Sequence, residues 1–356
     1  MKLKIKDWKI FKIFRRPKKI EERMRDAFLN VPKITDETIT EHREDILKGA
    51  RKYIYPLKHS SHYIVRISVI LFVVLVVIFF IFSSVELYDL QSTSSFITDV
   101  TNVIPFPVAK VGNSWISYNS YLFELRREMH YYETQQQVNF SLKSNVNQLN
   151  NLKTQAMNQV ILNYYVKSLA QKYHITVSNQ EVNNEITYFQ NENRLGSNPS
   201  VLNNILNDFW GWNINDFKIE LKNELLQQKV VYALDHKTVN EAKSVYNQLL
   251  HGADFATLAQ QYSSDISTKN NGGQYPNPII ATDRTLAPQI MAELFSLKVN
   301  QISPIINTGY TLEIIKVDAI SGPSVTASHI EFILNNIHDY TSSLAKQERP
   351  HYFIKY

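Results

Sequence analysis

The sequence predicts one membrane-spanning helix near the N-terminus, then a mostly α-helical region, and finally an α+β unit with an antiparallel sheet. Three observations support this order. Residues 67–82 form an apolar run that only Ser68 interrupts. After a turn signal at Gly112-Asn113, apolar residues recur at helical spacing over a long stretch. From Thr238 onward, short helical segments give way to β-prone runs.

The 356-residue chain carries a formal charge of +5, and this charge is unevenly distributed. Residues 1–60 hold 17 Lys and Arg against 9 Asp and Glu, so the remainder has a small acidic excess. A nucleic-acid-binding protein carries its basic patch on a folded domain, so we expect no nucleic-acid partner. The lack of cysteine excludes disulfides and thiolate catalysis. The ten His residues show no metal-ligand spacing, so we expect neither a metal nor a cofactor.

Residues 64–85 are predicted to form the transmembrane helix. The segment has 22 residues, and about 20 are needed to span the hydrocarbon core of a bilayer. Arg66, near one end, can extend its charge to the interface. The helix of a soluble core is rarely apolar on every face. A cleavable signal peptide would start closer to the N-terminus and end in a small-residue cleavage site, so an uncleaved anchor is the better interpretation.

The charges that flank this segment predict its orientation. The flank before it carries four cations: Arg51, Lys52, Lys58 and Arg66. The flank after it carries Glu86 and Asp89, and no Lys or Arg before Lys110. The positive-inside rule therefore places residues 1–63, a basic tail, in the cytoplasm and the C-terminal domains outside the cell membrane. The tail either contacts anionic lipid or is solvated and only sets the topology.

Residues 86–107 have the composition of a linker, with a Ser-rich stretch and then two prolines. Gly112-Asn113, between two short β-prone runs, predicts a hairpin that opens a helical domain over residues 108–237. Apolar residues at helical spacing predict a helix across residues 152–169, and Ser178 with Glu181 forms a capping box for the next helix. We expect a break at residues 196–199 and a further helix over residues 215–234.

Aromatic residues are frequent in this helical domain, among them Phe209, Trp210, Trp212 and Phe217. Aromatic side chains at helical spacing are usually part of a core. A second interpretation is that they form an apolar cradle for another polypeptide.

The segment 238–334 has the pattern of an α+β unit. Thr238 and Glu241 resemble a capping box, and Asp254 is expected to cap the short helix FATLAQQY. A third helical stretch, PQIMAELFSL, precedes two predicted strands, QISPII and TLEIIKV. The last predicted strand is TASHIEFIL. Residues 335–356 are left as a C-terminal tail without an assigned role.

Residues 239–318 resemble the parvulin (PpiC-type) peptidyl-prolyl isomerases. The resemblance rests on the GADFATLAQQYSSD run, on Gly272-Gly273, on the spacing of FSLKVNQISPI, and on Gly309-Tyr310 before an apolar strand. Residues 108–235, with VAKVGNSWIS and QVILNYYVKSLAQKYHITVSNQEV, resemble the helical N-terminal chaperone domain of SurA, PpiD and PrsA proteins. This resemblance implies a SurA-N-like helical domain followed by a parvulin-like α+β domain.

Two features depart from the family pattern. Parvulins begin with a strand that carries a His-Ile-Leu motif, and the segment before Thr238 lacks it. The motif instead resembles residues 326–330, beyond the other end of the domain. This placement suggests a circularly permuted parvulin, although the same strand would also fit the start of a second, truncated unit. The family often carries a second His two residues after the Gly of the last strand, where this chain has Thr311.

The resemblance also implies a set of site residues. It implies catalytic roles for Asp265 and for His329, the latter if the permutation holds. It implies substrate-binding roles for four residues: Leu286, Ile290, Thr308 and Thr311. Structural roles are the alternative, since the apolar pair could be core, Asp265 could cap a turn, and a single His on a strand is often structural.

The resemblance implies a membrane-anchored extracytoplasmic folding factor that isomerises X–Pro bonds. Its partners would be unfolded or partly folded exported polypeptides, their Pro-containing segments, and membrane lipid. The alternative is a non-catalytic holdase chaperone whose degenerate parvulin domain only binds peptide segments. The pair Asp265 and His329 favours the enzyme, whereas Thr311 and Ile290 favour the holdase. A structural component of a surface or secretion assembly is a third interpretation.

Overall fold

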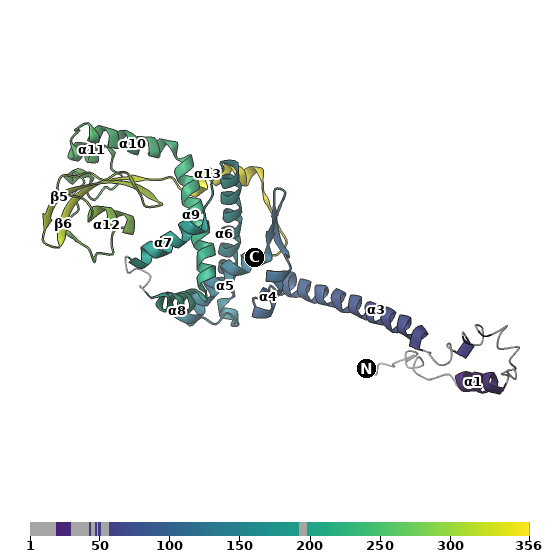
Figure 1. Ribbon diagram of the computed structural model, residues 1–356. Helices are drawn as coiled ribbons and strands as arrows, with labels where there is room; N and C mark the ends of the chain where they lie inside the picture. The colour runs from purple at the N-terminus through teal and green to yellow at the C-terminus, as the bar shows by residue number, and fades with distance from the viewer. Residues whose placement is uncertain are drawn as a thin grey trace. The chain divides into compact units, whose positions relative to one another are not determined.

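The computed structural model describes residues 19–29, 43, 47, 49–50, 57–191 and 198–355, and it divides into two compact units (Figure 1). The first is Met1–Phe80 and the second is Ile81–Tyr356. The first unit contains α1 (Lys19–Leu29) and most of α3 (Leu57–Ser84), and the division falls within α3. The predicted basic tail, residues 1–63, lies largely outside the described residues.

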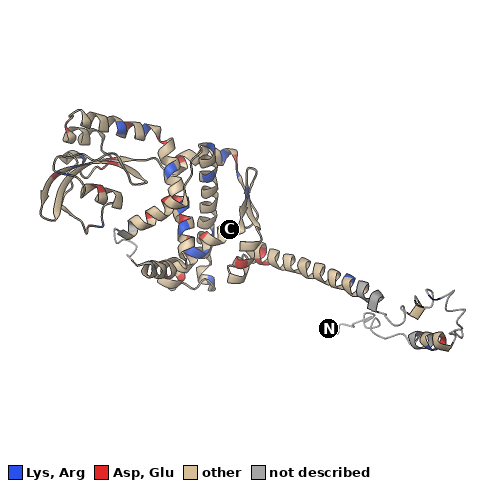
Figure 2. Ribbon diagram, in the orientation of Figure 1, with Lys and Arg blue, Asp and Glu red and all other residues tan. Residues whose placement is uncertain are grey.

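Helix α3 has the length and composition of a membrane span. The most apolar 18 residues within Tyr63–Asp89 have a mean hydropathy of 3.2, and among the described residues this is the one helical stretch that is long and apolar enough to cross a bilayer. Its most apolar window buries no side chains against the rest of the chain. Most of α3 carries no Lys, Arg, Asp or Glu (Figure 2). The apolar segment of α3 is therefore not a buried core helix.

Residues 86–107, which we expected to be a linker, are instead folded into the second unit. They contain a short π-helix, η2 (Val85–Asp89), and α4 (Ser95–Val103), whose first turn is capped by Ser94. Leu87 and Ile97 are fully buried, and the hydroxyl of Tyr118 donates to the carbonyl oxygen of Leu87 at 2.6 Å. The segment therefore folds despite its linker-like composition, because its few apolar residues are buried against the neighbouring helices.

The helical region begins with the predicted hairpin and continues as a helical bundle. Strands β1 (Pro107–Val111) and β2 (Ser114–Ser117) pair antiparallel across Gly112-Asn113. The following elements are α5 (Tyr118–Gln135), η3 (Lys143–Asn145), α6 (Val146–Lys172), α7 (Asn179–Asn191), α8 (Pro199–Trp210) and α9 (Ile214–Leu234). The predicted capping box at Ser178 and Glu181 is confirmed, since each side chain bonds the other residue's backbone N–H. Of the expected break at residues 196–199, residues 196 and 197 lie outside the described residues, and Asn198 and Pro199 form the start of α8.

The core of the helical region forms where α5 packs against α6 (Figure 1). Tyr118, Tyr121 and Leu125 from α5 are buried against Leu152 and Met157 from α6. A second cluster joins α7, α8 and α9, and there Trp212 is buried and stacks on Phe123 at a ring separation of 5.3 Å. Trp212 is therefore largely a core residue, as the plainer interpretation of the aromatics predicted.

The α+β unit follows directly after α9. Its elements are α10 (His236–Leu250), α11 (Phe255–Tyr262), η4 (Lys269–Asn271), β3 (Ile279–Ile280), α12 (Pro288–Leu294), β4 (Ile306–Asn307), β5 (Thr311–Ser321) and β6 (Ser324–Ile333). The predicted strand QISPII is shorter than expected, with one isolated bridge at Ile302 and then β4. The helix-capping residue also differs, because Asp235 rather than Thr238 caps α10.

The sheet of this unit is antiparallel with the order β3-β6-β5-β4. Strands β5 and β6 form a long hairpin in which Ile315 pairs with His329. Alternating residues face opposite sides, so Ile314 and Ile330 contact the α10 and α11 side, whereas Ile315 and Ala327 contact the α12 side. The sheet is therefore covered by helices on both faces (Figure 1).

Residues 335–356, predicted as a tail, return to the helical region and complete it. They form α13 (Ile337–Gln347) and β7 (Pro350–Tyr352), and β7 pairs antiparallel with β1 in a sheet of order β2-β1-β7. Ile337 and Ile354 are buried, and the hydroxyl of Tyr165 donates to the carbonyl oxygen of Glu348 at 2.7 Å. The α+β unit is thus an insertion between α9 and α13 of the helical region (Figure 1).

Candidate active site

The centre of the candidate site is His329 on β6, which is only 5% exposed. Its Nδ1 atom lies 3.0 Å from Oε2 of Glu313 on the neighbouring strand β5. Its Nε2 atom lies 2.9 Å from Oδ2 of Asp265, in the loop after α11. The two strands of the hairpin and a loop 64 residues before His329 therefore converge on one imidazole, and a carboxylate faces each of its ring nitrogens.

Asp265 is held in place by the loop that follows it. Its Oδ1 accepts hydrogen bonds from the backbone N–H and the hydroxyl of Ser267, at 2.9 and 2.6 Å. Its Oδ2 accepts a bond from the hydroxyl of Thr268 at 2.6 Å, and this hydroxyl also lies 2.9 Å from Nε2 of His329. The carboxylate therefore has both roles considered from the sequence, because it caps a turn and also faces the imidazole.

Gly273 allows the loop to approach the strand that carries His329. It has a positive φ of 81°, and its carbonyl accepts the backbone N–H of His329 at 2.8 Å. A Cβ atom at this position would lie 2.2 Å from the carbonyl oxygen of His329. Two residues further along, the ring of Tyr275 stacks on the imidazole with centroids 4.3 Å apart and an interplanar angle of 18°. The loop thus covers the imidazole from one side.

The surrounding carboxylates favour the protonated imidazole. Burial acts to lower the pKa of His329, but the hydrogen bonds and charges of Glu313 and Asp265 outweigh it and raise the pKa. Burial acts to raise the pKa of Asp265, but hydrogen bonds from Ser267, Thr268 and His329 outweigh it and lower the pKa. The site therefore favours the protonated imidazole of His329 beside the ionised carboxylate of Asp265.

Glu313 is the site residue that the sequence analysis missed. We expected Thr311 at the second-His position, but the hydroxyl of Thr311 lies 2.8 Å from that of Thr308 within the turn and donates to Oε1 of Glu313 at 3.2 Å. Thr311 therefore reaches the imidazole only through Glu313. The period-two alternation of β5 carries the missing signal, because counting back from Ile315, the pairing partner of His329, places Glu313 on the face that carries His329.

The two apolar residues predicted to grip the Pro ring lie on the α12 side of the sheet. Ile290 is buried among Leu294, Ile315 and Val317, so it is part of the core. Leu286 is partly buried at the edge of the same cluster, which Tyr275 also contacts. Of the pair, Leu286 is thus the more accessible residue, and the substrate-binding roles of both stay predictions.

A cavity of about 600 Å³ lies beside Thr311, between α9 and the adjacent end of the sheet. Its lining is mainly apolar and includes Val231, Tyr310, Ile333 and Ile337, with Glu331 as a carboxylate. Burial raises the pKa of Glu331, and the charge of Glu313, its pairing partner across the strands, raises it further. This cavity connects the helical region with the edge of the buried network.

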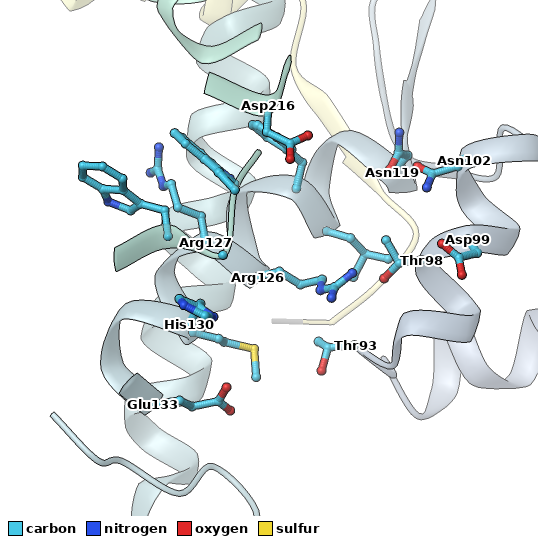
Figure 3. Close-up of a pocket in the computed structure, with 16 residues that line it drawn as sticks. Thr93, Thr98, Asp99, Asn102, Asn119, Arg126, Arg127, His130, Glu133 and Asp216 are labelled. Atoms are coloured by element: carbon cyan, nitrogen blue, oxygen red, sulfur yellow. The ribbon is translucent and has the colours of Figure 1, made fainter. Parts of the chain in front are cut away.

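A second cavity of about 420 Å³ lies in the helical region, away from the network around His329 (Figure 3). Figure 3 shows side chains from α5 on one side and from α4 on the other: Arg126, Arg127, His130, Thr98, Asp99 and Asn102. Trp210 and Trp212 also line it, and the guanidinium of Arg127 lies 5.6 Å from the ring of Trp212. Phe209 and Phe217 from the predicted aromatic cradle are not among its lining residues.

Carboxylates of the helical region contact Arg127, which lines this second cavity. Arg127 lies 3.4 Å from Oε2 of Glu124 and 3.2 Å from Oε1 of Glu220. Glu124 is almost fully buried, and burial followed by the charge of Glu220 raises its pKa, with Arg127 opposing them. With Glu128 at 2.7 Å, three carboxylates therefore share the guanidinium of Arg127.

Comparison with known proteins assigns both parts of the chain. Residues 58–231 match the family model of the SurA-like N-terminal domain, and residues 227–319 match that of the PPIC-type PPIase domain. The chain therefore consists of a SurA-like N-terminal domain joined to a PPIC-type parvulin domain, which confirms the predicted resemblance. The second match ends before β6, so His329 and its strand lie outside it.

Two named relatives agree with this assignment. The chain is 30% identical over 168 residues to the foldase protein PrsA of Caldanaerobacter subterraneus subsp. tengcongensis, covering 43% of this chain and 52% of that protein. It is 34% identical over 117 residues to the parvulin-like PPIase of Rickettsia bellii, covering 33% and 40% of the two chains. The chain thus spans about half or less of the length of these relatives. The crystal structure of the peptidylprolyl isomerase PrsA from Bacillus anthracis matches at 20% identity with a TM-score of 0.18, covering 54% of this chain and 86% of that one.

Proposed function

We propose that this chain is a peptidyl-prolyl cis/trans isomerase and chaperone, and that Asp265, His329 and Glu313 form its catalytic network. The observation that carries the proposal is the geometry of the buried imidazole, which meets one carboxylate at 2.9 Å and another at 3.0 Å within a PPIC-type domain. Three polar groups from three segments would be costly to bury for stability alone. A functional role explains why the fold retains them.

The chemistry requires that the barrier to rotation about the X–Pro bond be lowered. That barrier is about 18–20 kcal/mol because amide resonance must be lost in the twisted state. Resonance places negative charge on the carbonyl oxygen, so a carboxylate near this oxygen disfavours the planar form relative to the twisted one. The partly exposed carboxylate of Asp265 is the group of the network that can reach a bound peptide, and Glu313 and His329 hold it in position. No cofactor is needed for these steps.

We further propose that the parvulin sheet is circularly permuted. Strand β6 carries the His-containing motif and lies between β3 and β5, inside the sheet that the PPIC-type domain requires. In this arrangement the His-containing strand follows β5 through the hairpin at Gly322-Pro323, instead of preceding the first helix of the domain. The alternative of a second, truncated unit has less support, because after β6 the chain continues into α13, which packs on the helical region.

The SurA-like domain is proposed to hold unfolded polypeptides. The cavity in Figure 3 combines the aromatic rings of Trp210 and Trp212 with the cations Arg126 and Arg127. Aromatic rings can contact apolar side chains, and guanidinium groups can donate to peptide carbonyl groups. This combination suits an extended polypeptide without a fixed sequence, and it would retain a client near the isomerase site.

We propose that α3 anchors the protein in the cell membrane with its N-terminus in the cytoplasm. The support is the mean hydropathy of 3.2 over the most apolar 18 residues within Tyr63–Asp89, and the excess of cations before the segment. Both folded domains would then lie on the extracytoplasmic side. Their clients would be exported proteins with Pro-containing segments that are unfolded or partly folded.

The second candidate function is a holdase whose parvulin domain binds peptides without isomerising them. Two observations favour it: the imidazole of His329 is almost fully buried, and Ile290 belongs to the core instead of to an open pocket. In that case the network around His329 would only stabilise the loop after α11.

The deciding experiment is isomerisation of a short X–Pro peptide by the full-length protein in detergent. Wild type is compared with Asp265→Ala and His329→Ala, and with Asp254→Ala as a control that removes an exposed helix cap in the same domain. Acceleration that is lost in the first two variants and kept in the control supports the isomerase. If wild type shows no acceleration and still suppresses aggregation of an unfolded client, the holdase is the correct function.

A further inference from the structure

The segment between the apolar helix α3 and the first strand has an exposed apolar face that no part of the described chain covers. In α4, Ile97 and Thr101 point into the core, while Thr98 and Asn102 line the cavity of Figure 3. A third face of the same helix carries Phe96, which is 54% exposed. Each face of this nine-residue helix therefore has a different environment.

The exposed face continues along the helix and onto its neighbour. Val103 lies seven residues after Phe96, two helical turns further on the same face, and is 82% exposed. The ring of Phe96 lies 6.3 Å from that of Phe82, at the end of α3, which is also exposed. An apolar surface therefore extends from the last turn of the apolar helix onto α4. We name this surface, formed by Phe82, Phe96 and Val103, the α4 face.

We propose that the α4 face lies in the interfacial layer of the lipid bilayer, so that α4 is a membrane-surface helix. The proposal rests on the proposed anchoring of α3 and adds a second membrane contact made by the folded unit. Two observations carry it. The α4 face is continuous with the last turn of α3 through Phe82, and Phe96 and Val103 are exposed on it. Amphipathic helices bury one such apolar face at the headgroup boundary.

The charges near α4 indicate which lipid it meets. The segment from residue 82 to residue 109 contains Glu86, Asp89 and Asp99 and no Lys or Arg. Acidic groups at a bilayer surface are repelled by anionic headgroups, so the contact is apolar and suits a zwitterionic surface. Because α4 also lines the cavity of Figure 3, the contact places this client-binding cavity beside the membrane, where exported chains emerge.

The absence of cysteine from the whole chain makes site-specific labelling straightforward. Phe96→Cys and Val103→Cys, each in the full-length protein, receive an environment-sensitive fluorophore after reconstitution into phosphatidylcholine vesicles. Val77→Cys within α3 tests the anchor itself. Leu250→Cys, an exposed apolar position on α10, is the matched control for a side chain that faces water.

Lipids that carry a nitroxide either at the headgroup or deep in the acyl chain then report depth. We expect headgroup nitroxide to quench the labels at positions 96 and 103, deep nitroxide to quench the label at position 77, and neither to quench the label at position 250. We also expect Phe96→Asp to reduce quenching of the label at position 103 while leaving that at position 77 unchanged. Addition of anionic lipid should not increase quenching at position 96 or 103.

Three outcomes overturn the inference. Quenching at position 77 without quenching at positions 96 and 103 leaves the anchor intact and removes the surface helix. No quenching at any position overturns the anchor and the surface helix together. A blue-shifted label at position 96 that lipid nitroxide does not quench, and whose shift depends on protein concentration, assigns the α4 face to a second copy of the chain.

Discussion

Asp235 accepts the backbone N–H of Asn335 through Oδ2 at 2.8 Å, across 100 residues of sequence. Its Oδ1 accepts the backbone N–H of Thr238, which caps α10. These residues stand at the two points where the chain crosses between the helical region and the α+β unit. One buried carboxylate therefore joins the chain that enters the PPIC-type domain to the chain that leaves it.

Replacement of this carboxylate should destabilise the connection between the domains. In Asp235→Ala two backbone N–H groups lose their acceptor, one of them a helix cap, and we expect a loss on the order of 2–4 kcal/mol in the free energy of unfolding. Urea denaturation measures the loss, and Asp254→Ala, which removes an exposed cap of α11, is the control. Equal losses in the two variants would mean that the bond to Asn335 contributes nothing.

Glu313 should matter more for catalysis than Thr311. Glu313→Gln keeps the shape of the side chain and removes the charge that faces Nδ1 of His329 at 3.0 Å. Hydrogen bonds to charged groups contribute about 1.5–3 kcal/mol, so we expect kcat/KM for an X–Pro peptide to fall about tenfold to a hundredfold. Thr311→Val removes a hydroxyl that contacts the carboxylate of Glu313 but not the imidazole, so this variant should have a much smaller effect. A larger loss in Thr311→Val than in Glu313→Gln would show that Thr311, and not Glu313, takes the role of the family's second His.

Two residues that the structure brings together, Asp265 and His329, were named from the sequence because they belong to recognisable local patterns. Asp265 follows a helix with a clear cap, and His329 lies in a short motif that can be recognised on any strand. Glu313 could not be found in the same way, because its role depends on the register between β5 and β6. In a hairpin the turn sets the register, but an irregularity between Val317 and Ala319 shifts it, so a count from the turn alone does not pair Ile315 with His329.

Segments at the domain boundaries were also beyond what local patterns can predict. Residues 86–107 and 335–356 were expected to be a linker and a tail, and both are folded. Each contributes only a few apolar residues, such as Leu87 and Ile354, to a core whose other side comes from distant helices. Amphipathic spacing within so short a segment is a weak signal, whereas burial against a preformed surface decides its structure.

The pH dependence of stability should report the charges around His329. Its raised pKa stabilises the folded state fully below the ordinary His pKa of about 6.5, and this stabilisation is lost as the pH rises through the raised value. The lowered pKa of Asp265 has the opposite sign, so its stabilisation is present above about pH 3.9 and is lost as the pH falls. Urea unfolding of wild type and His329→Gln between pH 5 and 9 provides the measurement. The difference in free energy of unfolding between them should shrink as the pH rises, and a constant difference would contradict an imidazolium in the folded state.

Glu124 should destabilise the helical region at neutral pH. Burial raises its pKa, so the folded state keeps a proton that the unfolded chain releases above about pH 4.3, and stability falls as the pH rises from there through the raised value. Glu124→Gln removes this penalty, and we expect a gain on the order of 2 kcal/mol at pH 8 and little change at pH 4. The control Glu128→Gln removes another partner of Arg127, at 2.7 Å, from a more exposed position. Destabilisation by Glu124→Gln at pH 8 would show that the ion pair with Arg127 outweighs the burial of the carboxylate.

Gly273 should tolerate no side chain, although its backbone conformation alone does not require this. Gly273 and Gly252 have similar positive φ angles of 81° and 85°. A Cβ at Gly252 meets nothing within 4 Å, whereas a Cβ at Gly273 would lie 2.2 Å from the carbonyl oxygen of His329. Gly252→Ala should therefore cost about 1–2 kcal/mol from the left-handed conformation alone.

Gly273→Ala should cost clearly more than Gly252→Ala, because the loop must withdraw from β6 and lose the bond between Gly273 and the N–H of His329. That withdrawal also moves Tyr275 off the imidazole, so isomerase activity should fall further than stability predicts. Urea unfolding and kcat/KM, measured side by side at a temperature where both variants are folded, separate the two effects. If the two variants lose the same stability and the same activity, then close approach of the loop is not what positions the imidazole.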